Sequence, residues 1–78
     1  MAEFRVKAFG RLAEFANDGI LPVKVEGDVA ALRSVLADMH PGFSSLPYRV
    51  AVNRQIVEDH HALNAGDEIA VMPPFSGG

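Results

Sequence analysis

The stretch DVAALRSVLADM, residues 28–39, decides the fold. Four of its apolar residues follow the i, i+3, i+4, i+7 spacing of one helical face: Leu32, Val35, Leu36 and Met39. Asp28 can cap the start of this helix, and Pro41-Gly42 ends it because proline cannot continue the hydrogen-bond ladder. We expect a loop over residues 43–47. A helix with one apolar face must bury that face against another element, so the flanking segments should supply a sheet.

Two strands are expected before the helix. Residues 4–8 alternate apolar and charged side chains, which is the pattern of a strand with one face on a core and the other in water. Residues 21–26 show the same alternation, and Pro22 stands near the strand start, where a missing amide donor is tolerated. Between them, residues 10–16 predict a short helical turn, and a turn at residues 17–19 follows. The two strands together predict a hairpin.

Three strands are expected after the helix. Tyr48 opens an alternating stretch that reaches Asn53, and Asn53-Arg54 predicts a tight turn into a very short strand at residues 55–57. The last strand covers residues 68–72, with Ile69 and Val71 facing inward. The order is strand, strand, helix, strand, short strand, strand. This order predicts an α+β fold in which one main helix crosses a mixed sheet.

The size and charge of the chain limit what it can do. Its 78 residues are enough for one small domain, too small for both a full core and a deep active-site cleft. It holds no cysteine, which excludes disulfides, thiolate nucleophiles and iron–sulfur ligation and fits a reducing cytoplasm. The net charge is −3, and the positive residues are scattered along the sequence, which argues against nucleic acid as a partner. No apolar run approaches the roughly 20 residues of a membrane span, so we expect a soluble, cytoplasmic module without membrane contact.

The ordinary catalytic residues form no recognisable constellation in the sequence. His60-His61 could suggest a metal site, but adjacent strand residues point to opposite faces and no third ligand is evident, which favours a solvated loop. Asp59 lies beside His60 without a nucleophile, which argues against a catalytic triad. His40 falls at the end of the helix, where a capping role is the simpler interpretation. We expect no catalytic site and no metal site within this chain, and whether it acts as an enzyme subunit stays open at this point.

The most informative segment is MPPFSGG, residues 72–78. Pro73-Pro74 should stop the last strand and hold the remaining four residues away from the body, because proline lacks an amide donor and favours extended backbone. Those four residues reach at most about 13 Å. Gly77-Gly78 has no side chains and could thread a channel in which any Cβ would collide. We therefore expect a domain at residues 1–72 and an extended tail at residues 73–78, with a frayed end or a cloning remnant as the alternative.

The chain as a whole resembles the ubiquitin-like sulfur carriers, most closely the small subunits of molybdopterin synthase. Motifs along the entire sequence carry this resemblance: Phe9-Gly10-Arg11-Leu12 with Glu14, Ala31-Leu32-Arg33, Val50-Ala51-Val52-Asn53, Gly66-Asp67-Glu68-Ile69-Ala70-Val71 and Pro73-Pro74-Phe75-Ser76-Gly77-Gly78. The resemblance implies a ubiquitin-like β-grasp fold, which agrees with the element order. Gly10 and Phe75 depart from the residues common at these positions in the family.

The resemblance also implies a chemistry for the tail. A terminal carboxylate is ionised at neutral pH and is a poor electrophile. In the family, a ubiquitin-activating-like adenylyltransferase uses ATP and magnesium to convert it to an acyl adenylate, and a sulfur donor then installs a thiocarboxylate, here on Gly78. The large subunit of molybdopterin synthase, in a heterotetramer, accepts the tail, and the thiocarboxylate supplies sulfur to the pterin precursor of the molybdenum cofactor. This chain itself is expected to bind no cofactor.

Other roles would share the fold and the tail. One is a sulfur carrier for thiamine, a sulfur amino acid or tRNA thiolation. Another is a ubiquitin-like protein modifier joined through Gly78 to a lysine, and a third is a plain interaction module. The Pro-Pro-hydrophobic-Ser-Gly-Gly ending favours the molybdopterin role.

Strand alternation predicts where partners dock. Residues on the sheet face away from the helix include four apolar ones: Phe9, Ala51, Ala70 and Met72. With Ile56 on the short strand they would form an exposed apolar patch, which usually marks an interface. The resemblance places partner contacts at Phe9, Ile56 and Met72. Phe75 is expected to anchor in a partner pocket. The alternatives are that Phe9 tucks under the short helix, that Met72 only covers an edge, and that Phe75 folds back on its own domain.

Overall fold

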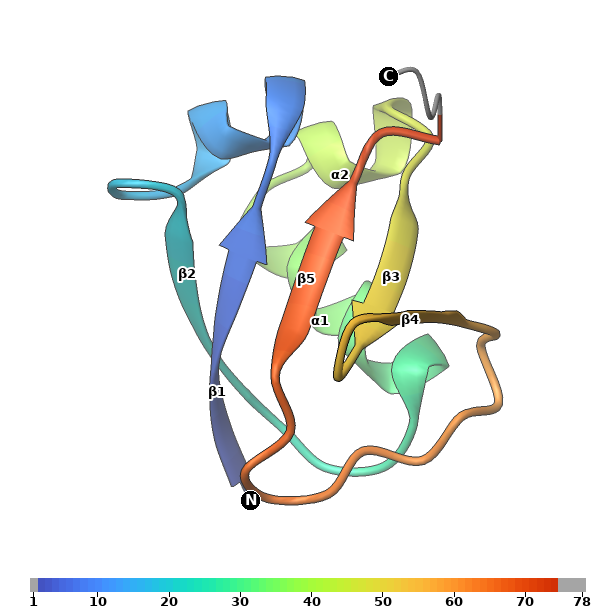
Figure 1. Cartoon of the computed structure of the whole chain (residues 1–78). Helices are drawn as coiled ribbons and strands as arrows, with labels where there is room; N and C mark the ends of the chain where they lie inside the picture. The colour runs from blue at the N-terminus through green and yellow to red at the C-terminus, as the bar shows by residue number, and fades with distance from the viewer. Residues whose placement is uncertain (1, 75–78) are drawn as a thin grey trace.

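The computed structural model describes residues 2–74, and Figure 1 traces the order of their helices and strands. A five-stranded sheet lies in front of the main helix in this view. The elements in chain order are β1 (Ala2–Ala8), the 3-10 helix η1 (Gly10–Phe15), β2 (Ile20–Val25), α1 (Val29–Met39), α2 (Gly42–Ser45), β3 (Arg49–Val52), β4 (Gln55–Val57) and β5 (Ile69–Met72).

The sheet is mixed, with strand order β2-β1-β5-β3-β4. β1 pairs antiparallel with β2, which confirms the expected hairpin, and parallel with β5. β3 pairs antiparallel with both β5 and β4. The first and last strands therefore lie side by side in the middle of the sheet, and α1 crosses behind them (Figure 1). This is the mixed sheet crossed by one main helix that the sequence predicts, with the topology of a β-grasp.

The hydrophobic core lies between this sheet and α1. Alternate residues of the strands point into it, as the period-two pattern predicts. The buried apolar side chains that form it are Phe4, Val6, Ala8, Leu12, Leu21, Val23, Val25, Val29, Leu32, Leu36, Phe43, Val50, Val52, Ile69 and Val71. No polar or charged side chain of residues 2–74 is buried. The core therefore depends on apolar packing rather than on buried polar networks.

α1 begins where the sequence places it. The Ala31 amide donates to Asp28 Oδ1 at 3.0 Å, which is the expected N-cap. The buried stripe is only partly as predicted: Leu32 and Leu36 are fully buried, whereas Met39 is 39% exposed. Val29, which the predicted stripe omits, is fully buried. At 100° per residue the centre of the buried face runs through positions 29, 32 and 36, so Met39 lies off the centre of that face in the last turn.

A second short helix replaces the expected loop at residues 43–47. α2 follows Pro41, and the Ser44 amide donates to the Pro41 carbonyl at 2.9 Å. Its Phe43 is buried, with its ring 4.9 Å from that of Phe15 and 5.5 Å from that of Tyr48. A single helical turn is not stable by itself. The burial of the Phe43 ring against two other aromatic rings therefore stabilises a short helix that the local sequence does not predict.

The turn between β3 and β4 is as predicted. Asn53 and Arg54 both have positive φ, 53° and 71°, as a tight hairpin turn requires. The Asn53 side chain also joins this turn to the chain before β5: its amide donates to Asp67 Oδ1, and its carbonyl accepts from the Glu68 amide. The Asn64 amide donates to Asp67 Oδ2 at 2.8 Å. These hydrogen bonds from Asn64 and then Asn53 lower the pKa of Asp67.

Candidate docking surface at the root of the tail

Three residues predicted to contact partners come together on the outer face of the sheet, the face away from α1. Phe9 follows β1, Ile56 lies in β4 and Met72 ends β5. Phe9 and Ile56 are each 51% exposed, and Met72 is half-buried. All three line one hollow of about 260 Å³. The exposed ring excludes the alternative in which Phe9 is tucked under the short helix.

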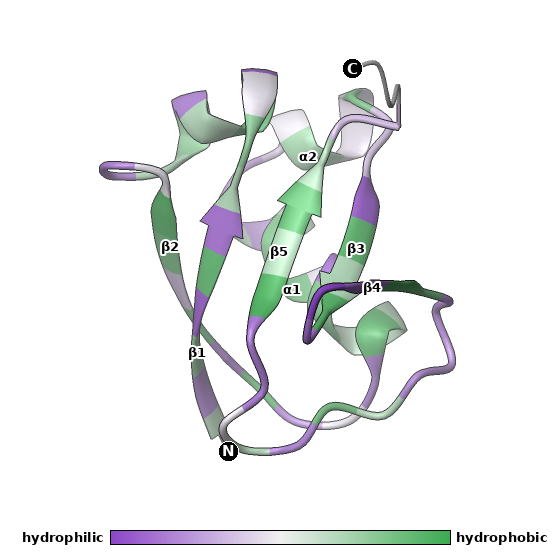
Figure 2. Ribbon diagram, viewed as in Figure 1, coloured by the Kyte–Doolittle hydropathy of each residue, from purple (hydrophilic) through white to green (hydrophobic). Residues whose placement is uncertain are grey.

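The floor of this hollow is made of small side chains. Ala51 in β3 lies opposite Ala70 in β5 and opposite Ile56 in β4. The expectation that Ala51 is exposed is wrong, because this residue is only 6% exposed in the middle of the sheet. Figure 2 shows β5 coloured as hydrophobic along its length, in the middle of this face. We call the five apolar residues the docking patch: Phe9, Ala51, Ile56, Ala70 and Met72.

Charged side chains lie at one side of the docking patch. Lys7 Nζ is 3.3 Å from Glu68 Oε2, and Arg54 Nε is 3.9 Å from Glu68 Oε1. All three residues line the same hollow as the patch. Their side chains are well exposed, so these ion pairs contribute little to the stability of the fold. They are available to re-pair with the charges of a partner.

The root of the tail packs on Gly10. Gly10 has a φ of +62°, and a Cβ built on it would lie 2.7 Å from Pro73 Cγ. Glycine is therefore required here both by the backbone and by the proline ring. The role of Gly10 at the tail root was not predicted, because neither its φ nor its distance to residue 73 is visible in the sequence. Phe9, which precedes Gly10, belongs to the docking patch. The backbone therefore joins the docking patch to the residue on which the tail root packs.

Pro73 and Pro74 are the two residues of the expected 73–78 tail that the structure describes. Both are half-buried and line a small hollow of about 200 Å³, whose other lining residues are Arg11, Leu12, Leu46 and Pro47. Phe75, Gly77 and Gly78 lie outside the described residues. Their expected roles stay predictions.

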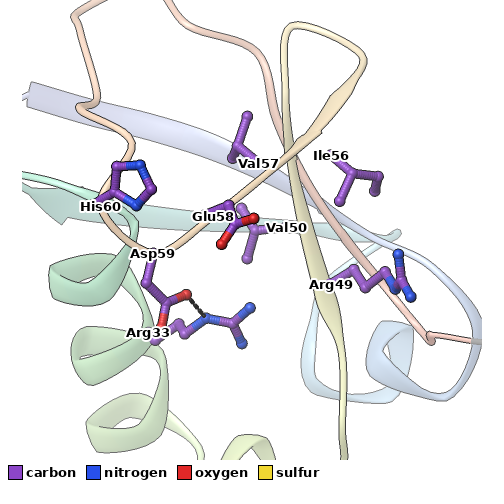
Figure 3. A pocket seen from close by; sticks show the side chains of 8 residues that line it. All are labelled: Arg33, Arg49, Val50, Ile56, Val57, Glu58, Asp59 and His60. Atoms are coloured by element: carbon purple, nitrogen blue, oxygen red, sulfur yellow. Dashed lines mark hydrogen bonds and ion pairs between the residues drawn. The ribbon is translucent and has the colours of Figure 1, made fainter.

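A separate hollow lies between α1, β3 and the loop after β4, and Figure 3 shows its lining. Arg33 Nε donates to Asp59 Oδ1 at 2.8 Å, and the guanidinium lies 4.5 Å from the centroid of the Tyr48 ring. Burial raises the pKa of Tyr48 above its ordinary value, and the nearby Arg33 partly opposes this rise. Arg33 thus connects the helix to Asp59 in the loop and to Tyr48, the residue before β3. Arg49 and Ile56 line the other side of this hollow (Figure 3), and Ile56 also belongs to the docking patch.

The histidines do not gather into a site in the described part of the chain. His60 and His61 are exposed, and among residues 2–74 no three His, Cys, Asp or Glu side chains come close enough to hold a metal ion. His40 follows the last residue of α1, and its ring stacks on Phe15 at 5.7 Å. No helix within residues 2–74 has the length and apolar character needed to cross a bilayer.

Comparison with known proteins places this geometry in a family. A model described as the ThiS family matches residues 6–78. Comparison with curated proteins finds no match. Among solved structures, small archaeal modifier protein 1 from Haloferax volcanii is 30% identical, covers 96% of this chain and 100% of its own, and superposes with a TM-score of 0.81.

Two further structures support the fold alone, because their identity is low. A putative molybdopterin converting factor subunit 1 from Pyrococcus furiosus is 22% identical over 96% of this chain and 100% of its own, with a TM-score of 0.85. A chain from the complex of subunits 1 and 2 of the molybdopterin-converting factor of Helicobacter pylori is 23% identical over 97% of this chain and 99% of its own, with a TM-score of 0.68. The family match and the 30% identical relative show that the chain belongs to the ThiS family, with the β-grasp fold of the ubiquitin-like sulfur carriers.

Proposed function

We propose that this protein is a sulfur carrier that acts as the small subunit of a molybdopterin synthase. The observation that carries the proposal is the position of the docking patch, an exposed apolar surface that reaches the root of residues 73–78 through Phe9 and Gly10. A partner that binds the patch would meet the tail at its root. The family match, which extends to residue 78, supports a functional tail.

In the activation step, the carboxylate of Gly78 attacks the α-phosphorus of ATP. Pyrophosphate leaves, and the product is an acyl adenylate. Hydrosulfide from a sulfur donor then attacks the acyl carbon, AMP leaves, and a terminal thiocarboxylate remains. ATP and magnesium belong to the adenylyltransferase partner, and we expect the cycle to run in the cytoplasm.

In the transfer step, Gly77-Gly78 enters the active site of the large subunit. The thiocarboxylate sulfur attacks a carbon of the pterin precursor, and an oxygen substituent of that carbon takes up a proton and leaves. Water then cleaves the acyl carbon–sulfur bond. The sulfur stays on the pterin and the carboxylate returns. Phe9, Ile56 and Met72 hold the large subunit, and Phe75 anchors in a pocket of the partner. The Helicobacter pylori relative was solved as a complex of two such subunits, which supports a partner of this kind.

A second candidate is a ubiquitin-like protein modifier. The 30% identity to small archaeal modifier protein 1 favours it. In this role the amine of a lysine, in place of hydrosulfide, attacks the activated Gly78 carbonyl, and an isopeptide bond forms. A carrier for thiamine or another thiolation pathway would use the same thiocarboxylate with a different acceptor.

The first experiment is the intact mass of the protein after incubation with its adenylyltransferase, ATP, magnesium and sulfide. A mass gain equal to one oxygen replaced by sulfur, located on Gly78, is the result expected of a carrier. Deletion of Gly78, or one residue added after it, should abolish the gain and leave thermal unfolding unchanged, because the core residues are the same in all three forms. If the variant without Gly78 still gained sulfur, the tail mechanism would be wrong.

The acceptor is identified in a second experiment. The thiocarboxylate form is mixed with the large subunit and the pterin precursor, and dithiolene formation is measured. Transfer of sulfur supports the molybdopterin role. Thiocarboxylate that forms but is not transferred points to another thiolation pathway, and lysine conjugates in the presence of ATP with no sulfur gain point to a modifier.

A further inference from the structure

The outer face of the sheet gathers most of the positive side chains of the protein. On the strands, residues whose side chains alternate away from α1 include Arg5, Lys7, Lys24 and Arg49. Arg54, in the β3–β4 turn, lines the docking patch hollow. We call these five the outer cations. The acidic residues on the same face are Glu3 in β1, Glu26 after β2, Glu58 in the hollow that Arg49 and Ile56 also line, and Glu68 beside the patch.

The charge of the protein is therefore divided between two sides. All its charged side chains lie within residues 2–74, and the outer face holds five of seven Lys and Arg but four of ten Asp and Glu. That face carries +1, and the remainder of the molecule carries −4, for the net charge of −3. In the sequence these cations are up to 49 residues apart. The sheet order brings them to one surface.

The outer cations are weakly neutralised within the protein. Lys7 and Arg54 share a single acceptor, Glu68, at 3.3 and 3.9 Å. The described residues provide Arg5, Lys24 and Arg49 with no ion pair. Like charges on one face repel one another, and the repulsion falls when opposite charges approach. The outer face can therefore gain favourable electrostatic energy from a negatively charged partner.

We infer that the outer face recognises an acidic protein surface that has an apolar centre. The apolar centre meets the docking patch, and carboxylates around it meet the outer cations. This inference rests on the proposed function in one respect: it takes the partner of the tail to bind this face. Complementary charges at the rim of an interface mainly raise the association rate and select the partner.

A protein partner fits this face better than a nucleic acid. The centre of the surface is an apolar hollow bounded by Phe9, Ile56 and Met72. The remainder of the molecule carries −4 and would repel a long polyanion. A compact acidic surface contacts the cations without approaching the negative side.

The test is an NMR titration of the isotope-labelled protein with defined probes, which does not depend on sulfur chemistry. The probes are the peptide EDLFED, its charge-reversed counterpart KRLFKR and a short single-stranded RNA. We expect EDLFED to shift amide signals of β1, β3 and β5 around the docking patch, and KRLFKR to shift none. Signals of exposed residues on α1 should not move.

Two pairs of variants with matched net charge locate the effect. The double variant Lys7→Gln/Arg54→Gln and the control Ser34→Glu/Ser44→Glu each make the net charge more negative by two, but Ser34 and Ser44 are exposed residues of α1 and α2, away from the outer face. Binding of EDLFED should weaken about fivefold in the first variant, as expected for two exposed ion pairs, and less than about twofold in the control. The difference should shrink at about 0.5 M salt, where the screening length is only a few ångströms.

Three outcomes would overturn the inference. Equal weakening in both variants would mean that only net charge matters. Equal binding of EDLFED and KRLFKR would mean that the face has no charge preference. RNA that binds the outer face more tightly than EDLFED would assign the surface to nucleic acid. The mass experiment on Gly78 is unaffected by any of these results, so the failure of this inference and that of the sulfur-carrier proposal can be told apart.

Discussion

The two faces of the sheet are built by the same alternation of side chains but have different surroundings. The inner face is covered by α1, and its residues, such as Val6, Val50 and Val71, are inaccessible to solvent. The outer face has no covering element in the described structure, and it exposes Phe9 and Ile56 among positive charges. The inner face should therefore determine stability, and the outer face should determine which partner binds. Substitutions on the two faces should separate these properties.

The largest effect is expected from a cavity on the inner side. Leu32→Ala in α1 should lower the free energy of unfolding by about 3 kcal/mol, because a fully buried leucine is truncated. Ile56→Ala on the outer face should cost less than about 1 kcal/mol, because half of the side chain is already exposed. Urea denaturation measures both. If both variants lost a similar free energy of unfolding, the inner face would not determine stability more than the outer face does.

The tail root provides the next test, at the boundary between the outer face and the tail. Gly10 and Gly66 both have positive φ, but an added Cβ meets Pro73 at Gly10 and nothing within 4 Å at Gly66. Alanine at either position should cost about 1 kcal/mol of backbone strain. Gly10→Ala should cost about 1 kcal/mol more, because its methyl group collides with the proline ring.

The same pair of variants tests whether Gly10 directs the tail. Gly10→Ala should slow sulfur transfer by displacing Pro73, whereas Gly66→Ala should not. The transfer rate and the unfolding free energy are measured for each variant. Equal transfer rates in the two variants would mean that the packing of Pro73 on Gly10 does not direct the tail.

A smaller effect is expected at the start of α1. Asp28→Ala removes the acceptor for the Ala31 amide and should cost about 1 kcal/mol. Asp28→Asn keeps an acceptor oxygen and should cost clearly less. Denaturation curves of the two variants compare them, and partner binding should be unchanged in both. Loss of binding in Asp28→Ala at a temperature where it is fully folded would contradict the separation of the two faces.

The smallest effect concerns the pH dependence of the turn that carries Arg54. The pKa of Asp67 is lowered from 3.8 in the folded protein by the Asn64 amide and the Asn53 side chain. A lowered folded pKa means that its stabilisation is present above the unfolded pKa and is lost as the pH falls through the folded one. Unfolding measured between about pH 2 and 6 should show a shallower acid loss in Asp67→Asn than in the wild type. If the unfolding free energy changed equally with pH in both proteins, the Asp67 carboxylate would not stabilise the fold through its hydrogen bonds with Asn53 and Asn64.

The sequence predicts the fold well because most of its signals are local. The strand alternation, the Asp28 cap and the Asn53-Arg54 turn each depend on a few neighbouring residues, and all three are confirmed. α2 was missed because Phe43 is buried by residues distant in the chain. The burial of Ala51 was missed because it depends on the register with β4 and β5.

The candidate site also has some features that the sequence predicts and others that it does not. The alternation of side chains along the strands predicted that Phe9 and Met72 share one face, and the family resemblance added Ile56. The structure places all three around one hollow. The contact between Gly10 and Pro73 could not be predicted, because it joins residues 63 positions apart. Local patterns specify which side of a strand a residue occupies, but they do not specify its neighbours across the sheet.

By itself, the sequence determined the strands, the main helix, the inner and outer sides of the strands, and the family resemblance of the whole chain. Only the tertiary structure decided that the cations, which are scattered in the sequence, lie together on the outer face. The reason is that the alternation of side chains between the two faces is a property of one strand, with a period of two residues. A charged surface depends on strand order and register. In this protein the order β2-β1-β5-β3-β4 sets distant segments side by side and so creates a surface that no single segment contains.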